Sequence, residues 1–66
     1  MPEFECKLKT FRQQKGLTQE QLAALVGVRR ETIMRLEKAQ YNPSLKLAVD
    51  LSRAVGAPIA EIFIFE

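Results

Sequence analysis

The chain contains no histidine and no tryptophan, one cysteine, and only three glycines and three prolines among its 66 residues. Without histidine, and with Cys6 as the single thiol, the usual ligand set of a zinc site and an internal disulfide are both excluded. We interpret Cys6 as a small buried or half-buried thiol rather than a reactive one. No apolar run approaches the ~20 residues that a membrane-spanning helix needs. Residues 1–9 alternate charged and apolar side chains, unlike a signal peptide. These absences indicate a reducing, cytoplasmic setting without metal or cofactor.

Groups for catalysis are equally sparse. General acid–base or nucleophilic chemistry needs a reactive group, a positioned partner and a cleft, and the sequence offers neither a glycine-rich phosphate loop nor an obvious pair of carboxylates. The length allows one domain, residues 1–66. A chain of this size buries only ~60% of its unfolded surface, so association with a second copy is the simplest way to supplement its core. We therefore expect a binding protein and not an enzyme.

The net charge of +2 is unevenly distributed. Between Lys7 and Lys46 there are nine basic and three acidic residues, whereas the two ends together carry one arginine and five acids. A basic middle segment with acidic ends suits a polyanion on one surface and a different contact on another.

Apolar periodicity and turn residues divide the chain into short helices. We predict them at about residues 7–15, from Gln19 to Val26, 30–38, 45–55 and 58–62. Thr18 and Gln21 have the spacing of a capping box, which places a helix start at Gln19. Gly27 and Gly56 follow helical patterns where a left-handed closing residue is common. The helix at 45–55 is apolar over most of its circumference, which indicates a central position.

Both ends of the sequence read as short strands. Residues 3–6 alternate in polarity, with Phe4 and Cys6 predicted to face inward, and the final apolar residues would be apolar on both faces if extended. We predict that the two strands pair into a small antiparallel sheet beside an all-α, five-helix domain. An exposed aromatic edge favours association, so the predicted dimer interface consists of Ile62, Phe63, Ile64 and Phe65. The alternative is a disordered tail after the fifth helix.

Residues 19–38 have the dimensions of a helix-turn-helix unit. Ala23 is small where the two helices approach, and Gly27 lies in the turn. The remaining positions supply buried contacts from Leu22, Val26, Val28, Ile33 and Leu36. An Ala-x-x-x-Gly spacing alone is a weak signal, but the agreement of all these positions is a strong one.

This stretch resembles the Cro/C1-type, phage-repressor-like DNA-binding domain (the XRE family). The resemblance rests on residues 15–23, on Val26-Gly27-Val28, and on residues 32–37. Residues 41–45 are similar to those of short, stand-alone bacterial regulators of that family, such as the cytolysin operon repressor. The resemblance implies a five-helix, lambda-repressor-like domain that binds pseudo-palindromic, double-stranded operator DNA as a homodimer. The sequence shows no effector domain, so we predict no small-molecule effector.

The start of the third helix breaks two local rules. Arg29 and Arg30 stand where the helix dipole disfavours cations by ~0.3–1 kcal/mol each, and Arg29 occupies the place of a capping residue. Such violations are expected at functional sites. We predict base contacts from this helix, through Arg29, Arg30, Glu31 and Arg35. The alternatives are solvated arginines and an i,i+4 ion pair between Glu31 and Arg35.

Phosphate contacts are implied by the resemblance around this helix. Thr18, first a helix cap, and Gln19 lie at the start of the second helix, where anions bind readily. Thr32 is expected to touch a phosphate or a thymine methyl, with an ordinary surface threonine as the alternative. The segment after the recognition helix adds Lys38, Gln40, Tyr41 and Asn42. The resemblance also implies a structural ion pair between Arg12 and Glu37, which is not a DNA contact.

The predicted function is transcriptional regulation by sequence-specific DNA binding, most simply repression of its own or a neighbouring operon. The rival hypothesis is a protein-interaction module, such as an antitoxin or adaptor, that uses the same helices or the apolar end of the chain.

Overall fold

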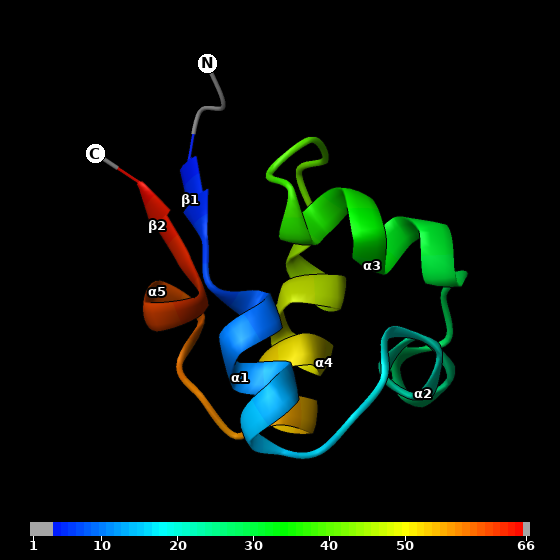
Figure 1. Ribbon diagram of the computed structural model, residues 1–66. Helices are drawn as coiled ribbons and strands as arrows, with labels where there is room; N and C mark the ends of the chain where they lie inside the picture. Colours follow the sequence, from blue (N-terminus) through cyan, green and yellow to red (C-terminus); the bar gives the residue numbers. More distant parts are fainter. Residues whose placement is uncertain (1–3, 66) are drawn as a thin grey trace.

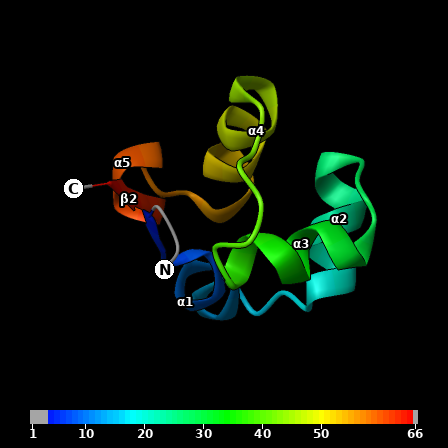
Figure 2. The ribbon, with the colours of Figure 1, turned by 90° about the horizontal axis from the view of Figure 1, so that it is seen from above.

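The computed structural model describes residues 4–65, which form five short helices and one two-stranded sheet. The elements in chain order are β1 (Phe4–Cys6), α1 (Leu8–Gln14), α2 (Gln19–Val26), α3 (Arg30–Glu37), α4 (Leu45–Val55), α5 (Ile59–Ile62) and β2 (Phe63–Phe65). In both ribbon views α2 and α3 lie on one side of the molecule and α5 with β2 on the other, with α4 between them (Figure 1, Figure 2). The predicted fold class is confirmed.

The local signals around α2 act as the sequence predicts. The Thr18 hydroxyl accepts a hydrogen bond from the Gln21 backbone N–H at 3.0 Å, and the Gln21 side-chain oxygen accepts one from the Thr18 backbone N–H at 2.8 Å. This capping box satisfies two backbone donors at the helix start. Gly27 closes α2 with a φ of 73°, a left-handed conformation that glycine adopts without strain. The start and end of α2 are thus fixed by adjacent residues.

The helix α4 is central, but it is less uniformly buried than its composition indicates. Its start is capped by the Ser44 hydroxyl, which accepts from the Leu47 N–H at 3.1 Å. Leu51 is fully buried, while Leu45, in the first turn, is 78% exposed. The inner face of α4 therefore covers the core, and its first residue projects into solvent.

The core lies among α1, α2, α3 and α4 and extends to the sheet. Its largest fully buried side chains come from every helix of the described chain: Leu8, Leu22, Ile33, Leu36, Leu51 and Ile62. Burying such a side chain contributes about 1.5–3 kcal/mol relative to leaving it in water. The contacts of α2 with α3 and of α2 with α4 fix the position of α3 on the surface.

The sheet joins the two ends of the described chain. β1 and β2 are antiparallel, with Phe4 opposite Phe65 and Cys6 opposite Phe63. The Phe4 ring stacks on that of Phe65 at a centroid distance of 5.2 Å and meets Phe63 edge-on at 5.9 Å. Phe4 is buried as predicted, and Cys6 is half-buried. Burial raises the pKa of the Cys6 thiol above its ordinary value, which disfavours the reactive thiolate.

Some predicted boundaries shift. Ile62 falls in both the predicted fifth helix and the predicted terminal strand; it ends α5, as the helix prediction has it, and its N–H donates to the Pro58 carbonyl at 3.3 Å. Its own carbonyl accepts from the Lys7 N–H at 2.8 Å and thereby anchors the start of the sheet. Lys38 is the closing residue of α3 rather than a member of the helix. Glu3, assigned by sequence to the first strand, lies outside the described residues.

Candidate nucleic-acid interface

The pair α2 and α3 has one buried side and one exposed side. Leu22 and Ala23 of α2 and Ile33 and Leu36 of α3 all enter the core. The turn between the helices is held by the Val28 N–H, which donates to the Ala23 carbonyl at 3.0 Å. This packing fixes the position of α3 at the surface. A helix that binds in a DNA groove needs such a fixed position.

The exposed side of α3 carries charged side chains that form no ion pair with the other described residues. Arg29, Arg30, Glu31 and Arg35 are all exposed. The Arg29 side chain makes no capping hydrogen bond, although its backbone has the extended conformation of a cap (φ −79°, ψ 153°). The ion pairs formed within residues 4–65 lie elsewhere, so the ion pair considered between Glu31 and Arg35 is not formed. Arginine and glutamate side chains are thus left available for an outside partner.

The segment that follows α3 begins with a strained residue. Ala39 has a φ of 56°, in the left-handed region that non-glycine residues rarely adopt. The conformation is held by two closing hydrogen bonds, from the Ala39 N–H to the Leu36 carbonyl at 3.0 Å and from the Gln40 N–H to the Arg35 carbonyl at 2.8 Å. The chain turns sharply here, and the four residues predicted to hold phosphates after α3 are exposed: Lys38, Gln40, Tyr41 and Asn42. Thr32, within α3, is half-buried.

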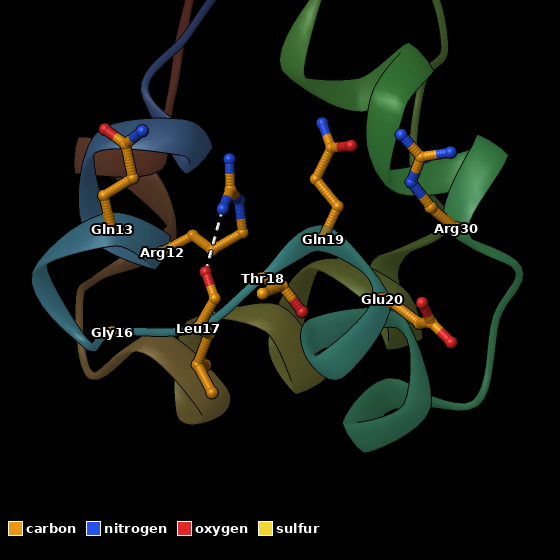
Figure 3. A pocket seen from close by; sticks show the side chains of 8 residues that line it. All are labelled: Arg12, Gln13, Gly16, Leu17, Thr18, Gln19, Glu20 and Arg30. Carbon is orange, nitrogen blue, oxygen red and sulfur yellow. Dashed lines mark hydrogen bonds between the residues drawn. The ribbon is translucent and has the colours of Figure 1, made fainter.

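A hollow lies between the end of α1 and the start of α2, with a side chain from α3 at its edge (Figure 3). Thr18, Gln19 and Glu20 line it from α2 and its cap, and Arg30 reaches it from α3. The N-terminus of α2 carries partial positive charge, which favours an anion here. The hollow therefore brings together two residues predicted to hold phosphates, Thr18 and Gln19, and one predicted to read a base, Arg30.

A buried network fixes the geometry of this hollow. Arg12 Nε donates to Glu37 Oε2 at 2.7 Å, and Arg12 Nη2 to Glu37 Oε1 at 3.3 Å. Arg12 Nη1 also donates to the Leu17 carbonyl at 2.8 Å (Figure 3). The side chains of Arg12 and Glu37 are only 9% and 5% exposed. The ion pair implied by the family resemblance is thus present, and it ties α1 to α3.

The network includes a residue that the sequence did not connect with it. Gln19 Nε2 donates to Glu37 Oε1 at 3.0 Å, so α2 is tied to the same carboxylate. This bond leaves the second N–H of the amide free, the donor that a phosphate would use. Throughout the described residues every buried side-chain nitrogen and oxygen has a hydrogen-bond partner. Gln19 is therefore held in place before any ligand arrives.

Residues 8–62 match the helix-turn-helix family. The chain belongs to this family. A transcriptional regulator from Archaeoglobus fulgidus is 57% identical over 60 residues, covering 91% of this chain and 84% of the relative. The cryptic phage CTXphi transcriptional repressor RstR of Vibrio cholerae is 34% identical over 59 residues, covering 89% of this chain and 53% of the relative. The family resemblance is confirmed, and the two relatives come from an archaeon and a bacterium.

Solved structures of this helix-turn-helix family have the same fold. The restriction-modification controller protein C.AhdI from Aeromonas hydrophila superposes with a TM-score of 0.74 at 37% identity, over 82% of each chain. The clp gene regulator ClgR from Corynebacterium glutamicum gives a TM-score of 0.75 at 31% identity, and this chain spans 57% of its length. The present chain is accordingly a transcriptional regulator with a DNA-binding fold, not an enzyme. None of the helices in residues 4–65 is long and apolar enough to cross a bilayer.

The predicted dimer interface of this helix-turn-helix regulator is divided by the fold. Ile62 is fully buried and Phe63 is 4% exposed, so both belong to the chain's own core. Ile64 is half-buried and Phe65 is 61% exposed, which leaves these two at the surface. Leu45, which the sequence assigned to the apolar circumference of α4, is exposed close to Phe65, since both line the same groove. The sequence signal for this exposure was the position of Leu45 in the first turn of α4, directly after the Ser44 cap.

Proposed function

We propose that this regulator binds a pseudo-palindromic operator as a homodimer and represses its own or a neighbouring operon by occupying the promoter. The observation that carries the proposal is the outer face of α3, where three arginines and one glutamate are exposed and none of them forms an ion pair within residues 4–65. Arginine donates bidentately to guanine, and glutamate accepts from cytosine, in the major groove. Repression is supported by the repressor name of RstR, with which this chain shares the matched segment.

The phosphate contacts surround this face. The hollow at the start of α2 would receive one phosphate through backbone N–H groups, Thr18 and the free N–H of Gln19. Lys38, Gln40, Tyr41 and Asn42 would hold the backbone beyond the other end of α3, and Thr32 would contact the backbone or a thymine methyl. In a dimer the two α3 helices would enter successive major grooves about 34 Å apart. The compartment would be the cytoplasm.

A titration with fluorescence anisotropy tests this proposal. The labelled duplex is the DNA upstream of the gene, random duplex is the competitor, and the titration is repeated at several salt concentrations. We expect saturable binding that resists the competitor and weakens with salt, with a log–log slope of about −0.9 for each phosphate neutralised. If the upstream DNA binds no better than random duplex, a randomised-site selection follows. Failure of that selection to enrich any sequence would refute operator binding and direct the search to a protein partner.

A substitution of Arg30 distinguishes base reading from phosphate binding. If it reads a base, Arg30→Ala should remove the preference for operator over random duplex. Because Arg30 lines the hollow beside Gln19, equal losses on both duplexes would instead make it a phosphate contact. Arg53→Ala is the matched control, since Arg53 is an exposed arginine on α4 and should leave both affinities unchanged.

A further inference from the structure

Two residues of α1, Arg12 and Gln13, line the hollow at the start of α2. The Arg12 guanidinium is bound to the Glu37 carboxylate and to the Leu17 carbonyl. The Gln13 side chain is exposed, and Figure 3 shows no hydrogen bond from its amide to the other residues that line the hollow. A side-chain amide has two N–H donors and an oxygen acceptor. The Gln13 amide therefore keeps donors for an outside partner.

The side chains around the hollow divide into two groups by direction. In Figure 3 the amides of Gln13 and Gln19 and the guanidinium of Arg30 point to the same side, although they come from three different helices. The carboxylate of Glu20 points to the opposite side. Hydrogen-bond donors thus gather on one rim of the hollow and the negative charge of Glu20 lies away from them. This arrangement favours an anion on the donor side.

We infer that Gln13 donates an amide N–H to the sugar–phosphate backbone of DNA at this hollow, and so extends to α1 the contact that Gln19 makes from α2. The inference rests on the proposed function and adds a binding residue to it. The hollow has a volume of about 550 Å³, the size of sites that hold whole small molecules, so a phosphate group fits within it. Side-chain amides are ordinary donors to DNA phosphates.

The backbone at the end of α1 does not oppose this contact strongly. The C-terminal end of a helix carries partial negative charge on its free carbonyl groups, which disfavours an anion. Here the Gln13 carbonyl accepts from the Gly16 N–H at 2.9 Å, and the Arg12 carbonyl accepts from the Leu17 N–H at 3.1 Å. Both carbonyls are thus occupied by the turn that follows α1. The side-chain amide of Gln13 is the group that this end of α1 offers to a phosphate.

Lys15 would be the obvious cation for a phosphate near the end of α1, but its side chain lies elsewhere. A Cβ atom at position 56 would lie 3.2 Å from Lys15 Cε and 3.3 Å from Lys15 Nζ. Gly56 closes α4, so the ammonium group lies at the C-terminal end of that helix, where the dipole favours a cation. Lys15 does not line the hollow. The contact from α1 therefore depends on a neutral amide.

A neutral donor to a phosphate has a distinctive effect on binding. Phosphate contacts carry no direct information on base sequence, so loss of the Gln13 amide should weaken binding to any duplex by the same factor. We expect a dissociation constant about three- to tenfold higher for each protomer on the DNA. An amide displaces no counterion, so the salt dependence should stay unchanged, whereas loss of a cation would reduce the log–log slope by about 0.9.

The test compares two neighbouring glutamines of α1. Gln13→Ala and Gln14→Ala remove the same amide from exposed positions, but Gln14 does not line the hollow. Fluorescence anisotropy measures the affinity of each variant for the duplex upstream of the gene and for random duplex at several salt concentrations, and circular dichroism checks the fold. We expect Gln13→Ala to weaken both complexes equally with an unchanged salt slope, and Gln14→Ala to have no effect.

A gain of affinity provides a second measurement, which a damaged fold cannot imitate. Gln13→Lys places a cation beside the phosphate, so it should strengthen binding to both duplexes and steepen the log–log slope by about 0.9 for each protomer. Gln14→Lys adds the same charge outside the hollow and should change the slope less.

The outcomes separate this inference from the proposed function. The inference is overturned if Gln13→Ala binds both duplexes as tightly as the wild type, if Gln14→Ala loses as much affinity, or if the loss is confined to the upstream duplex, which would make Gln13 a base contact. A reduced salt slope for Gln13→Ala also contradicts it. A wild type that binds both duplexes equally refutes operator specificity but still allows this test, because phosphate contacts act on both. A wild type that binds neither duplex refutes the proposed function, and the contact of Gln13 with it.

Discussion

Replacing Glu37 with glutamine should destabilise the fold severely, because it leaves the buried Arg12 without its counter-charge. The carboxylate accepts two hydrogen bonds from Arg12 and one from Gln19, and the Arg12 and Glu37 side chains are 9% and 5% exposed. Removing one partner of a buried ion pair typically costs about 3–5 kcal/mol. A domain of 66 residues has a free energy of unfolding of about 3–10 kcal/mol in total. We expect Glu37→Gln to lose about 3 kcal/mol, a large part of the stability.

Urea denaturation followed by circular dichroism measures this loss. With a slope of about 1 kcal/mol/M for a chain of this size, the midpoint should fall by about 3 M. Every variant is compared at one protein concentration, because association would add to the apparent stability. Asp50→Asn is the control: it removes an exposed i,i+4 pair with Lys46, whose side chain is 86% exposed, and should cost no more than about 0.5 kcal/mol.

The double variant Arg12→Met with Glu37→Leu tests whether the unpaired charge of Arg12 causes this loss of stability. If an uncompensated charge causes the loss, removing both charges should leave the protein more stable than Glu37→Gln. The reasoning would be refuted by a loss below about 1 kcal/mol for Glu37→Gln, or by a double variant that is less stable than the single one.

Three further substitutions test backbone conformation and base reading. Gly27→Ala should lower the free energy of unfolding by about 1–2 kcal/mol, because φ is 73° and a Cβ atom there meets nothing within 4 Å, so that only backbone strain is added. Ala39→Gly should raise the free energy of unfolding by up to about 1 kcal/mol, because it relieves the strain at φ 56°. Thermal unfolding measures whether each of these two variants is less or more stable than the wild type. Glu31→Gln, read out by randomised-site selection, should replace a preference for cytosine by one for adenine at one position of each half-site. An unchanged selected sequence would show that Glu31 reads no base.

Short-range chemistry explains which features the sequence predicted well. The start of α2 depends on Thr18 and Gln21, three residues apart, and its end depends on Gly27, so neighbouring residues are sufficient. The inward positions of Leu22 and Ile33 follow from helical spacing in the same way. These signals fixed the helix-turn-helix unit and therefore the placement of its outer face.

Features that depend on distant partners were not predicted in detail. The bond from Gln19 to Glu37 joins residues 18 positions apart, and no local pattern distinguishes it from a solvated glutamine. Leu45 belongs to an apolar helix by composition, but it is 78% exposed, and the apolar pattern of α4 does not distinguish it from the buried Leu51. At the chain end, Ile62 and Phe63 were grouped with Phe65 because all are apolar, while the turn of α5 buries the first two.

The pairing of Phe4 with Phe65 has a consequence for the order of folding. Contacts between neighbouring helices close short loops, whereas this sheet can form only when the two ends of nearly the whole chain meet. Loop closure over a longer segment costs more entropy, and contacts between distant residues form more slowly. The helix-turn-helix unit should therefore be assembled before the sheet, and hydrogen exchange should find the amides of β1 and β2 among the first to open. The exposed Phe65 ring lies on that late-forming sheet, so its stacking on Phe4 should be among the last contacts of the fold to form.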